Sequence, residues 1–179
     1  MSDIDRSTQF SPDRLYRYTL WREWDRDLLG VQPMHIWELG WKYVQFICLN
    51  PSTADETKDD PTIRRCIAFA KSWGYGALCM TNLFAFRATD PRRMMGHPNP
   101  VGCENDKWLV QISRTAGLIV AAWGTKGQFL GRDREVLKLL DDLHYLRKTK
   151  DGFPEHPLYL PQTLNPIPWS HESRVTPAR

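Results

Sequence analysis

Short apolar runs alternate with amphipathic segments along the chain, and this alternation narrows the folds open to it more than any other feature. Runs at residues 42–49, 77–83 and 118–123 have the length of buried strands, and residues 144–147 form a weaker fourth. Strands that alternate with helices are typical of a parallel sheet with right-handed crossovers. The sequence therefore predicts an α/β fold, in three α/β/α layers, around a short, mainly parallel, four-stranded sheet.

The segments between these strands carry helix signals. Asp60 can cap a helix and Pro61 suits its first turn, and apolar side chains then repeat on one face. The expected helices run from residue 60 to 74 or 76, from residue 105 or 106 through Ile112, and over 132–143.

The remaining segments complete a single domain over residues 1–179. Residues 15–21 are rich in β-formers and predict an additional antiparallel strand at a sheet edge. The prolines after Gly152 predict an irregular tail. We further expect flexible ends at 1–13 and 170–179, a helical turn at 25–29 closed by Gly30, and a long loop over 84–102.

Composition excludes several classes of protein. The chain has 179 residues, 41% hydrophobic and 25% charged, which is ordinary for a globular domain that builds its own core. A net charge of +3 is compatible with nucleic acid without demonstrating it. The four cysteines form no CxxC pair, and no signal peptide or membrane-spanning run is present, so we expect a cytoplasmic protein without membrane contact. The sequence does not indicate an oligomeric state.

Polar residues follow three of the predicted strands. Asn50, Pro51 and Ser52 follow the first, Asn82 ends the second, and Trp123-Gly124 ends the third. Because ligands bind at the carboxyl ends of strands in α/β sheets, these residues predict one shared site. Asn50 is interpreted either as part of a simple turn or as an amide that orients a water molecule or binds a ligand oxygen.

Residues around Asn82 suggest recognition of a planar, amide-like ring. An asparagine offers both a donor and an acceptor to such an edge, and Phe84 or Phe86 could stack on the ring. Arg87 could contact a phosphate. The structural alternative places both phenylalanines in the core, uses Asn82 as a turn cap and leaves Arg87 solvated.

Acidic residues crowd the segment before the first helix. Asp60 is explained as a helix cap, whereas Asp55 and Asp59 are candidates for a general base or metal ligand. The Trp123-Gly124 turn resembles one that offers backbone amides to a phosphate, but it lacks the P-loop and dinucleotide spacings.

His156 is the last candidate. It lies beside Pro157 in a loop and could stabilise a developing anion, or it could be a structural histidine.

Several of these motifs together resemble a family of uncharacterised bacterial and phage proteins. The motifs are LNPSTADETKDDPTIRR, TNLFAFRATDP, VGCENDKWL, VAAWG and HPLYLP, and the resemblance covers residues 16–161.

Their order is also similar, more distantly, to the uracil-DNA glycosylase superfamily. That resemblance implies a short parallel sheet and hydrolysis of the N-glycosidic bond of a flipped base. It implies that Asn50 positions water, Asn82 reads the base and His156 stabilises the departing base anion, with Leu158 and Tyr159 as wedges. The chain departs from that pattern at Leu158, where serine is usual, at Leu49 and Ser52 beside Asn-Pro, and in the acidic insertion.

We therefore expect a nucleobase-directed enzyme that hydrolyses an N-glycosidic bond in DNA or a nucleotide, without a cofactor or metal. One alternative is a non-catalytic module that binds a nucleotide or modified base. Another is a metal-dependent phosphodiesterase-like enzyme that uses Asp55, Asp59 and Asp60. The candidate catalytic residues are Asn50, Asp55, Asp59 and His156, and the candidate binding residues are Pro51, Ser52, Asn82, Phe84, Phe86, Arg87, Trp123, Gly124, Leu158 and Tyr159.

Overall fold

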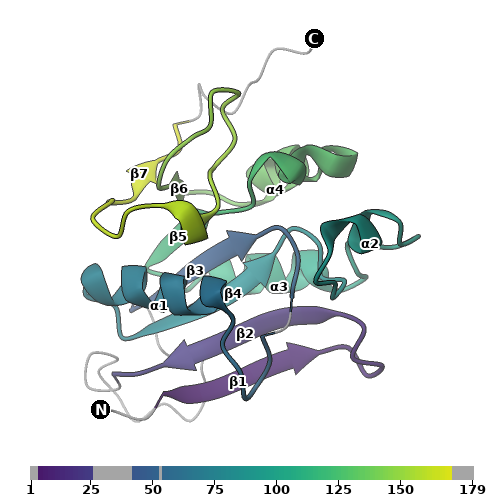
Figure 1. Ribbon diagram of the computed structural model, residues 1–179, viewed down its shortest axis with the longest axis horizontal. Coiled ribbons are helices and arrows are strands. Elements are labelled where there is room, and N and C mark those ends of the chain that lie inside the picture. Colours follow the sequence, from purple (N-terminus) through teal and green to yellow (C-terminus); the bar gives the residue numbers. More distant parts are fainter. Residues whose placement is uncertain (1–3, 26–41, 53, 171–179) are drawn as a thin grey trace.

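A single mixed sheet forms the centre of the protein (Figure 1). The computed structural model describes residues 4–25, 42–52 and 54–170. In these residues the sheet has seven strands in the order β1-β2-β4-β3-β5-β6-β7. The strands are β1 (Asp5–Phe10), β2 (Arg17–Glu23), β3 (Tyr43–Cys48), β4 (Ala77–Asn82), β5 (Leu118–Ala121), β6 (Leu143–Tyr145) and β7 (Ile167–Pro168).

The α/β class is confirmed, but the expected four-stranded, mainly parallel sheet is wrong. β4, β3, β5 and β6 are parallel to one another, and antiparallel strands extend this group on both sides. β2 is antiparallel, as predicted for residues 15–21, but β1 occupies the edge beyond it. The larger sheet arises because segments without an apolar pattern also pair as strands.

Helices cover both faces of the sheet (Figure 1). Phe46 of β3 packs in one apolar cluster with Ile63 of α1 (Pro61–Ser72), whereas the next residue, Ile47, packs with Val136 of α4 (Arg132–Leu139). α3 (Asn105–Ser113) lies on the α4 side, where Ile112 packs with Tyr43. Alternate residues of the central strand thus support opposite layers.

Three segments expected to be irregular contain regular structure. Residues 5–10 pair with β2 in a hairpin, although their sequence is polar. The loop over residues 84–102 includes α2 (Pro91–Met95), whose first turn is capped by Asp90. The proline-rich tail forms the 3-10 segment η3 (Pro157–Tyr159) and the edge strand β7, where proline is tolerated because no partner needs its missing N–H.

Other expectations differ in their boundaries. α4 ends at Leu139, before the predicted residue 143, because Leu140 takes an extended conformation. The predicted turn at 25–29 with Gly30 and the predicted flexible end at 170–179 lie almost wholly outside the described residues. Cys48, Cys66 and Cys79 are buried free thiols, as their apolar settings indicate.

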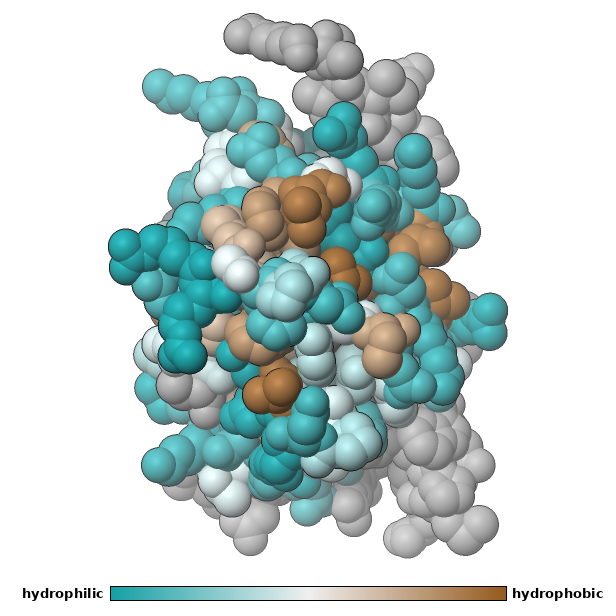
Figure 2. Space-filling view, turned by 90° about the vertical axis from the view of Figure 1, so that its right-hand side faces the viewer, coloured by the Kyte–Doolittle hydropathy of each residue, from teal (hydrophilic) through white to brown (hydrophobic). Residues whose placement is uncertain are grey.

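The face shown in Figure 2 is mainly hydrophilic, with apolar areas between hydrophilic side chains. Leu130 and Leu139 are among the exposed large apolar residues. None of the helices in the described parts of the chain is both long and apolar enough to cross a membrane.

A tight turn after β5 fixes the indole of Trp123, which is 2% exposed. Gly124 has a φ of 71°, a conformation that favours glycine, and its N–H donates to the carbonyl of Pro154 at 2.9 Å. Gly127 lies against the indole so closely that a Cβ on it would be 2.1 Å from Trp123 Cδ1. The turn therefore requires glycine for two separate reasons.

Gly127→Ala should lower the free energy of unfolding by about 1–3 kcal/mol, because the added methyl group overlaps the buried indole. Gly96→Ala is the matched control, since its Cβ would meet its nearest neighbour at 3.5 Å and φ is not positive there. Urea denaturation of both variants gives the comparison. Equal stability of the two variants would show that the Trp123 ring is not held as described.

Candidate functional site

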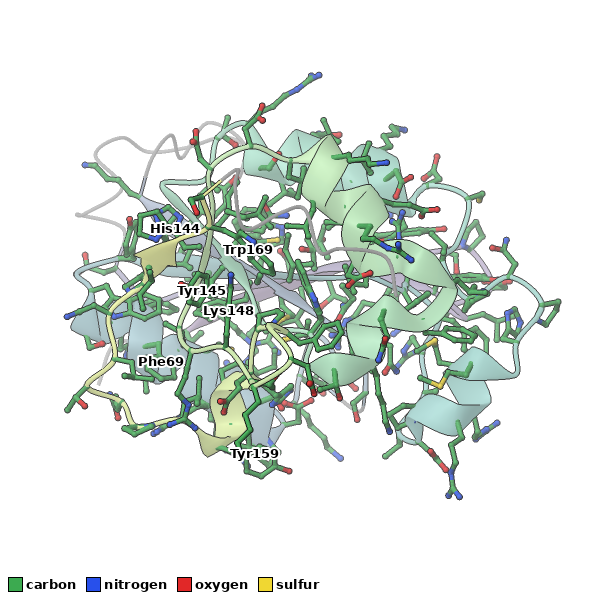
Figure 3. The ribbon with its side chains drawn as sticks, turned by 90° about the horizontal axis from the view of Figure 1, so that it is seen from above. Phe69, His144, Tyr145, Lys148, Tyr159 and Trp169 are labelled. Carbon is green, nitrogen blue, oxygen red and sulfur yellow. The ribbon has the colours of Figure 1, made fainter. Side chains whose placement is uncertain are left out.

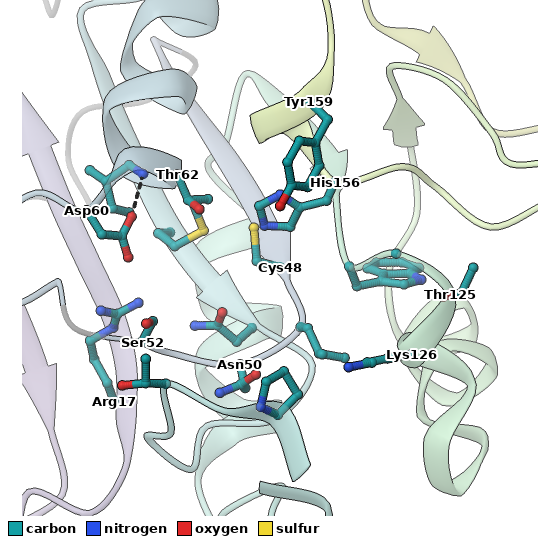
Figure 4. Close-up of a pocket in the computed structure, with 18 residues that line it drawn as sticks. Arg17, Cys48, Asn50, Ser52, Asp60, Thr62, Thr125, Lys126, His156 and Tyr159 are labelled. Carbon is teal, nitrogen blue, oxygen red and sulfur yellow. Dashed lines mark hydrogen bonds between the residues drawn. The ribbon is translucent and has the colours of Figure 1, made fainter. Parts of the chain in front are cut away.

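A pocket of about 540 Å³ opens at the carboxyl ends of β4, β3 and β5 (Figure 4). The start of α1 and the η3 segment also border it, and its size falls within the range of small-molecule sites. Its lining residues are Arg17, Cys48, Leu49, Asn50, Ser52, Asp60, Thr62, Ile63, Met80, Asn82, Thr89, Pro91, Trp123, Gly124, Thr125, Lys126, His156 and Tyr159.

Seven of the candidate site residues lie in this lining. They come from four separate stretches of chain, which the parallel strands and the η3 segment bring together. They are Asn50, Ser52, Asn82, Trp123, Gly124, His156 and Tyr159.

The remaining candidate binding residues do not line the pocket. Phe84 is buried against Phe129, and Phe86 stacks on His97 with 3.9 Å between ring centroids. Arg87 donates to the carbonyl of Arg14 at 3.1 Å. Pro51 is buried and Leu158 contributes a backbone N–H to His156 Nδ1.

The two predicted acidic candidates are also engaged elsewhere. Asp55 closes a turn by accepting from the N–H groups of Thr57 and Lys58, and these bonds lower the pKa of its carboxyl to about 2. Asp59 pairs at 2.5 Å with Arg22, whose side chain is fully buried. Arg22 in turn donates to the carbonyl of Asp55 at 2.6 Å, so both acids hold the segment before α1 in shape.

Asp60 is the member of the acidic cluster that reaches the pocket. Its Oδ1 accepts from the N–H of Ile63 at 2.9 Å and caps α1, as predicted. A capping carboxylate uses one oxygen for the helix, and Figure 4 shows the group facing the cavity. Among the described lining residues Asp60 therefore supplies one carboxylate, at the beginning of α1.

Two hydrogen bonds fix the amide nitrogen of Asn50. Nδ2 donates to the carbonyls of Ala88 at 2.7 Å and Pro51 at 3.0 Å, which ties the β3 end to the loop after β4. Oδ1 accepts no hydrogen bond from the described residues. Asn50 thus both shapes the turn and presents an acceptor at the pocket.

Asn82 is the most constrained polar group of the pocket. It is 1% exposed, and its enclosed Nδ2 has no acceptor among the described residues. The β4 end is held by Asn105, whose Nδ2 donates to the carbonyls of Asn82 at 3.0 Å and Leu83 at 2.9 Å. A donor left without a partner costs about 1–3 kcal/mol, so a ligand that accepts from Nδ2 would remove a standing penalty.

The loop over residues 147–155 precedes His156 and places it at the pocket. Arg147 and Glu155 join its two ends by side-chain bonds of 2.8 Å and 2.7 Å, and the Pro154 carbonyl accepts from Gly124. His156 Nδ1 accepts from the Leu158 N–H at 3.3 Å, so the neutral ring carries its proton on Nε2. Burial lowers the pKa of His156, against a smaller opposing effect of the Asp60 charge.

Aromatic rings support the Trp123 side of the pocket. Trp169 stacks on Trp123 with 5.9 Å between centroids, and Lys148 Nζ lies 4.4 Å from the ring centroids of both Trp169 and Tyr145 (Figure 3). A cation over two rings strengthens this packing. The indole therefore presents a rigid apolar wall.

Sequence reasoning missed Arg17, Thr62, Lys126 and Cys48 as pocket residues. Arg17 carried no decisive signal, because an arginine in a strand of β-formers can face either solvent or the interior. Burial raises the pKa of the Cys48 thiol to about 12, which disfavours its nucleophilic thiolate form. In the described ranges no three His, Cys, Asp or Glu side chains gather as a metal site would require.

Comparison with sequence families identifies the chain over most of its length. Residues 17–158 match DUF1643, a family described as a protein of unknown function. The chain belongs to this family. No curated protein and no solved structure matches it. The expected membership of an uncharacterised family is thus confirmed, and the resemblance to uracil-DNA glycosylases is not.

In this DUF1643 domain Asp59→Asn should destabilise the fold by about 3 kcal/mol, because it leaves the buried Arg22 without a counter-charge. Asp55→Asn is the control, since an asparagine oxygen can still accept in the turn, and it should cost less than about 1 kcal/mol. Chemical denaturation measures both. If the Asp59→Asn protein is as stable as the wild type but no longer binds ligand, Asp59 belongs to the binding site and does not have the structural role described.

A pH effect follows from the lowered pKa of His156. The folded protein binds this proton less readily than the unfolded chain, so the free energy of unfolding should be highest above pH 6.5 and fall as the pH drops below 6.5. The His156→Gln protein should lack the part of this decrease in the free energy of unfolding that comes from His156. Denaturation curves across that range test it, and parallel pH profiles of the two proteins would contradict it.

Proposed function

We propose that the pocket binds a nucleobase and that the protein hydrolyses the N-glycosidic bond of a nucleotide or of DNA. The observation that carries this proposal is the enclosed Nδ2 of Asn82, which has no acceptor among the described residues and lies in one pocket with Trp123 and His156. An amide side chain recognises the mixed donor and acceptor edge of a base, and the neighbouring indole offers a flat apolar surface.

His156 suits the stabilisation of a leaving group. A neutral imidazole that carries its proton on Nε2 donates a hydrogen bond without adding charge to the resting site. When the bond between the sugar carbon and the base nitrogen breaks, the electron pair stays on the base. A donor already oriented toward that anion favours the transition state. The lowered pKa of His156 keeps the ring neutral at pH 7.

The water that attacks the sugar carbon needs an acceptor and a base. Asn50 Oδ1 can orient it, and Asp60 is the carboxylate in the pocket that can take its proton. The water oxygen bonds to the sugar carbon while the base departs with the bonding pair. We assign the base role to Asp60, because Asp55 and Asp59 lie outside the pocket and hold the preceding segment.

A base-release assay tests the proposal. Purified protein is incubated with nucleotides and oligonucleotides that carry uracil, hypoxanthine or modified pyrimidines, and the released base is measured by chromatography. His156→Leu should lower kcat by about 10²–10³-fold with little change in KM, since it removes a donor that acts on the leaving group. Asn82→Leu should instead weaken base binding. Arg87→Ala changes a residue outside the pocket and should alter neither kcat nor base binding.

The outcomes separate the two main functions. Saturable base binding that depends on Asn82 but is never followed by base release would favour a non-catalytic binding module. Absence of both release and binding across the panel would contradict a nucleobase-directed site. The phosphodiesterase alternative predicts instead divalent-metal binding that is lost when Asp55, Asp59 and Asp60 become asparagine.

A further inference from the structure

Arg17 is a buried cation at one end of the pocket. The residue is 2% exposed, and Nη1 donates to the carbonyl of Ala54 at 2.5 Å. Its enclosed Nε has no acceptor, and no carboxylate lies within ion-pair distance among the residues the structure describes. Burial lowers the pKa of Arg17 to about 10, against a smaller opposing effect of the Asp60 charge, so the guanidinium is still charged at neutral pH. A buried charge without a directly paired carboxylate is unfavourable, and an anionic ligand would compensate it.

We infer that Arg17 holds the phosphate of the substrate and that the substrate class is a nucleoside monophosphate. This inference rests on the proposed function, because it places the base of the same ligand against Asn82 and Trp123. The chemistry it adds is a phosphate monoester recognised by a guanidinium, the planar donor group best matched to phosphate oxygens.

The charges of the pocket favour an anion. Arg17 and Lys126 are cations, Asp60 is the carboxylate in the lining, and His156 is neutral. The described lining therefore carries an excess of positive charge. Ser52 and Thr62 add hydroxyl groups to the same lining, and the first turn of α1 directs the positive end of its dipole there.

The arrangement of strands gives the pocket the length that such a ligand needs. Arg17 lies on β2, and Trp123 follows β5, which is separated from β2 by β4 and β3. Adjacent strands are about 4.8 Å apart, so these two side chains start from positions about 14 Å apart across the sheet edge. Figure 4 shows Arg17 and Ser52 on one side of the cavity and Lys126 on the other. A base, a sugar and a phosphate in line would span this distance.

Burial of Arg17 favours a terminal phosphate over one within a strand. A phosphate that contacts a side chain with 2% exposure must itself enter the cavity. An internal phosphodiester continues in both directions and would need the chain to pass in and out beside Arg17. A terminal monoester has only one connection and can enter as an end group.

Calorimetric binding measurements test the inference. Nucleoside 5′-monophosphates are compared with the matched nucleosides, with inorganic phosphate and with an oligonucleotide that has only internal phosphates. The wild-type protein should bind the monophosphate about 10- to 100-fold more tightly than the nucleoside, as a charge-assisted contact provides. Arg17→Met should abolish this difference, Arg17→Lys should keep part of it, and Arg87→Met, a loop arginine outside the pocket, should keep all of it.

Equal wild-type affinity for nucleoside and monophosphate would overturn the inference, even if the Arg17 variants did not fold. An Arg17-dependent preference for the oligonucleotide would overturn the terminal phosphate. Base release from oligonucleotides without any preference for monophosphates would refute Arg17 as a phosphate site and leave the proposed glycosidic activity in place. Tight, Arg17-dependent binding of the monophosphate without base release would support the phosphate site and contradict the activity.

Discussion

The site depends on the parallel pairing of β3 with β4 on one side and β5 on the other. Cys48 pairs with Asn82, and Ile47 pairs with Ala121, so three strands end at nearly the same level. Asn50 lies two residues after β3, Asn82 is the last residue of β4 and Trp123 lies two residues after β5, so these side chains converge at one edge. A shift in this register would turn the same residues toward the core.

The surrounding segments are attached to this edge by hydrogen bonds that leave functional groups free. Asn50 fixes the loop with its nitrogen and keeps its oxygen for the pocket. Asp60 caps α1 with one oxygen, and His156 accepts a backbone N–H on Nδ1 while retaining the Nε2 proton. Asn82, by contrast, has an enclosed donor without an acceptor among the described residues, as expected for a group whose hydrogen-bond acceptor is supplied by a ligand.

The sequence predicted the features that depend on local pattern. The central strands and the convergence of Asn50, Asn82 and Trp123 follow from apolar runs that end in polar or aromatic residues. The α1 cap follows from Asp60 before Pro61, and His156 was joined to the site by the resemblance alone. Long-range features were missed. The strand β1 has no apolar pattern and forms by pairing with β2. The structural role of Asp59 could not be recognised, because its partner Arg22 lies far away in the chain, whereas the turn that Asp55 closes with Thr57 and Lys58 is local.

The central claim is that Asn82 and Trp123 bind a planar ring in this pocket. NMR of the side-chain N–H groups tests it most directly, because Asn82 Nδ2 and Trp123 Nε1 are both buried and have no partner among the described residues. During titration with nucleoside 5′-monophosphates, both signals should shift together and saturate. The account would be contradicted if both signals stayed unchanged at saturation while the backbone signals of another surface responded.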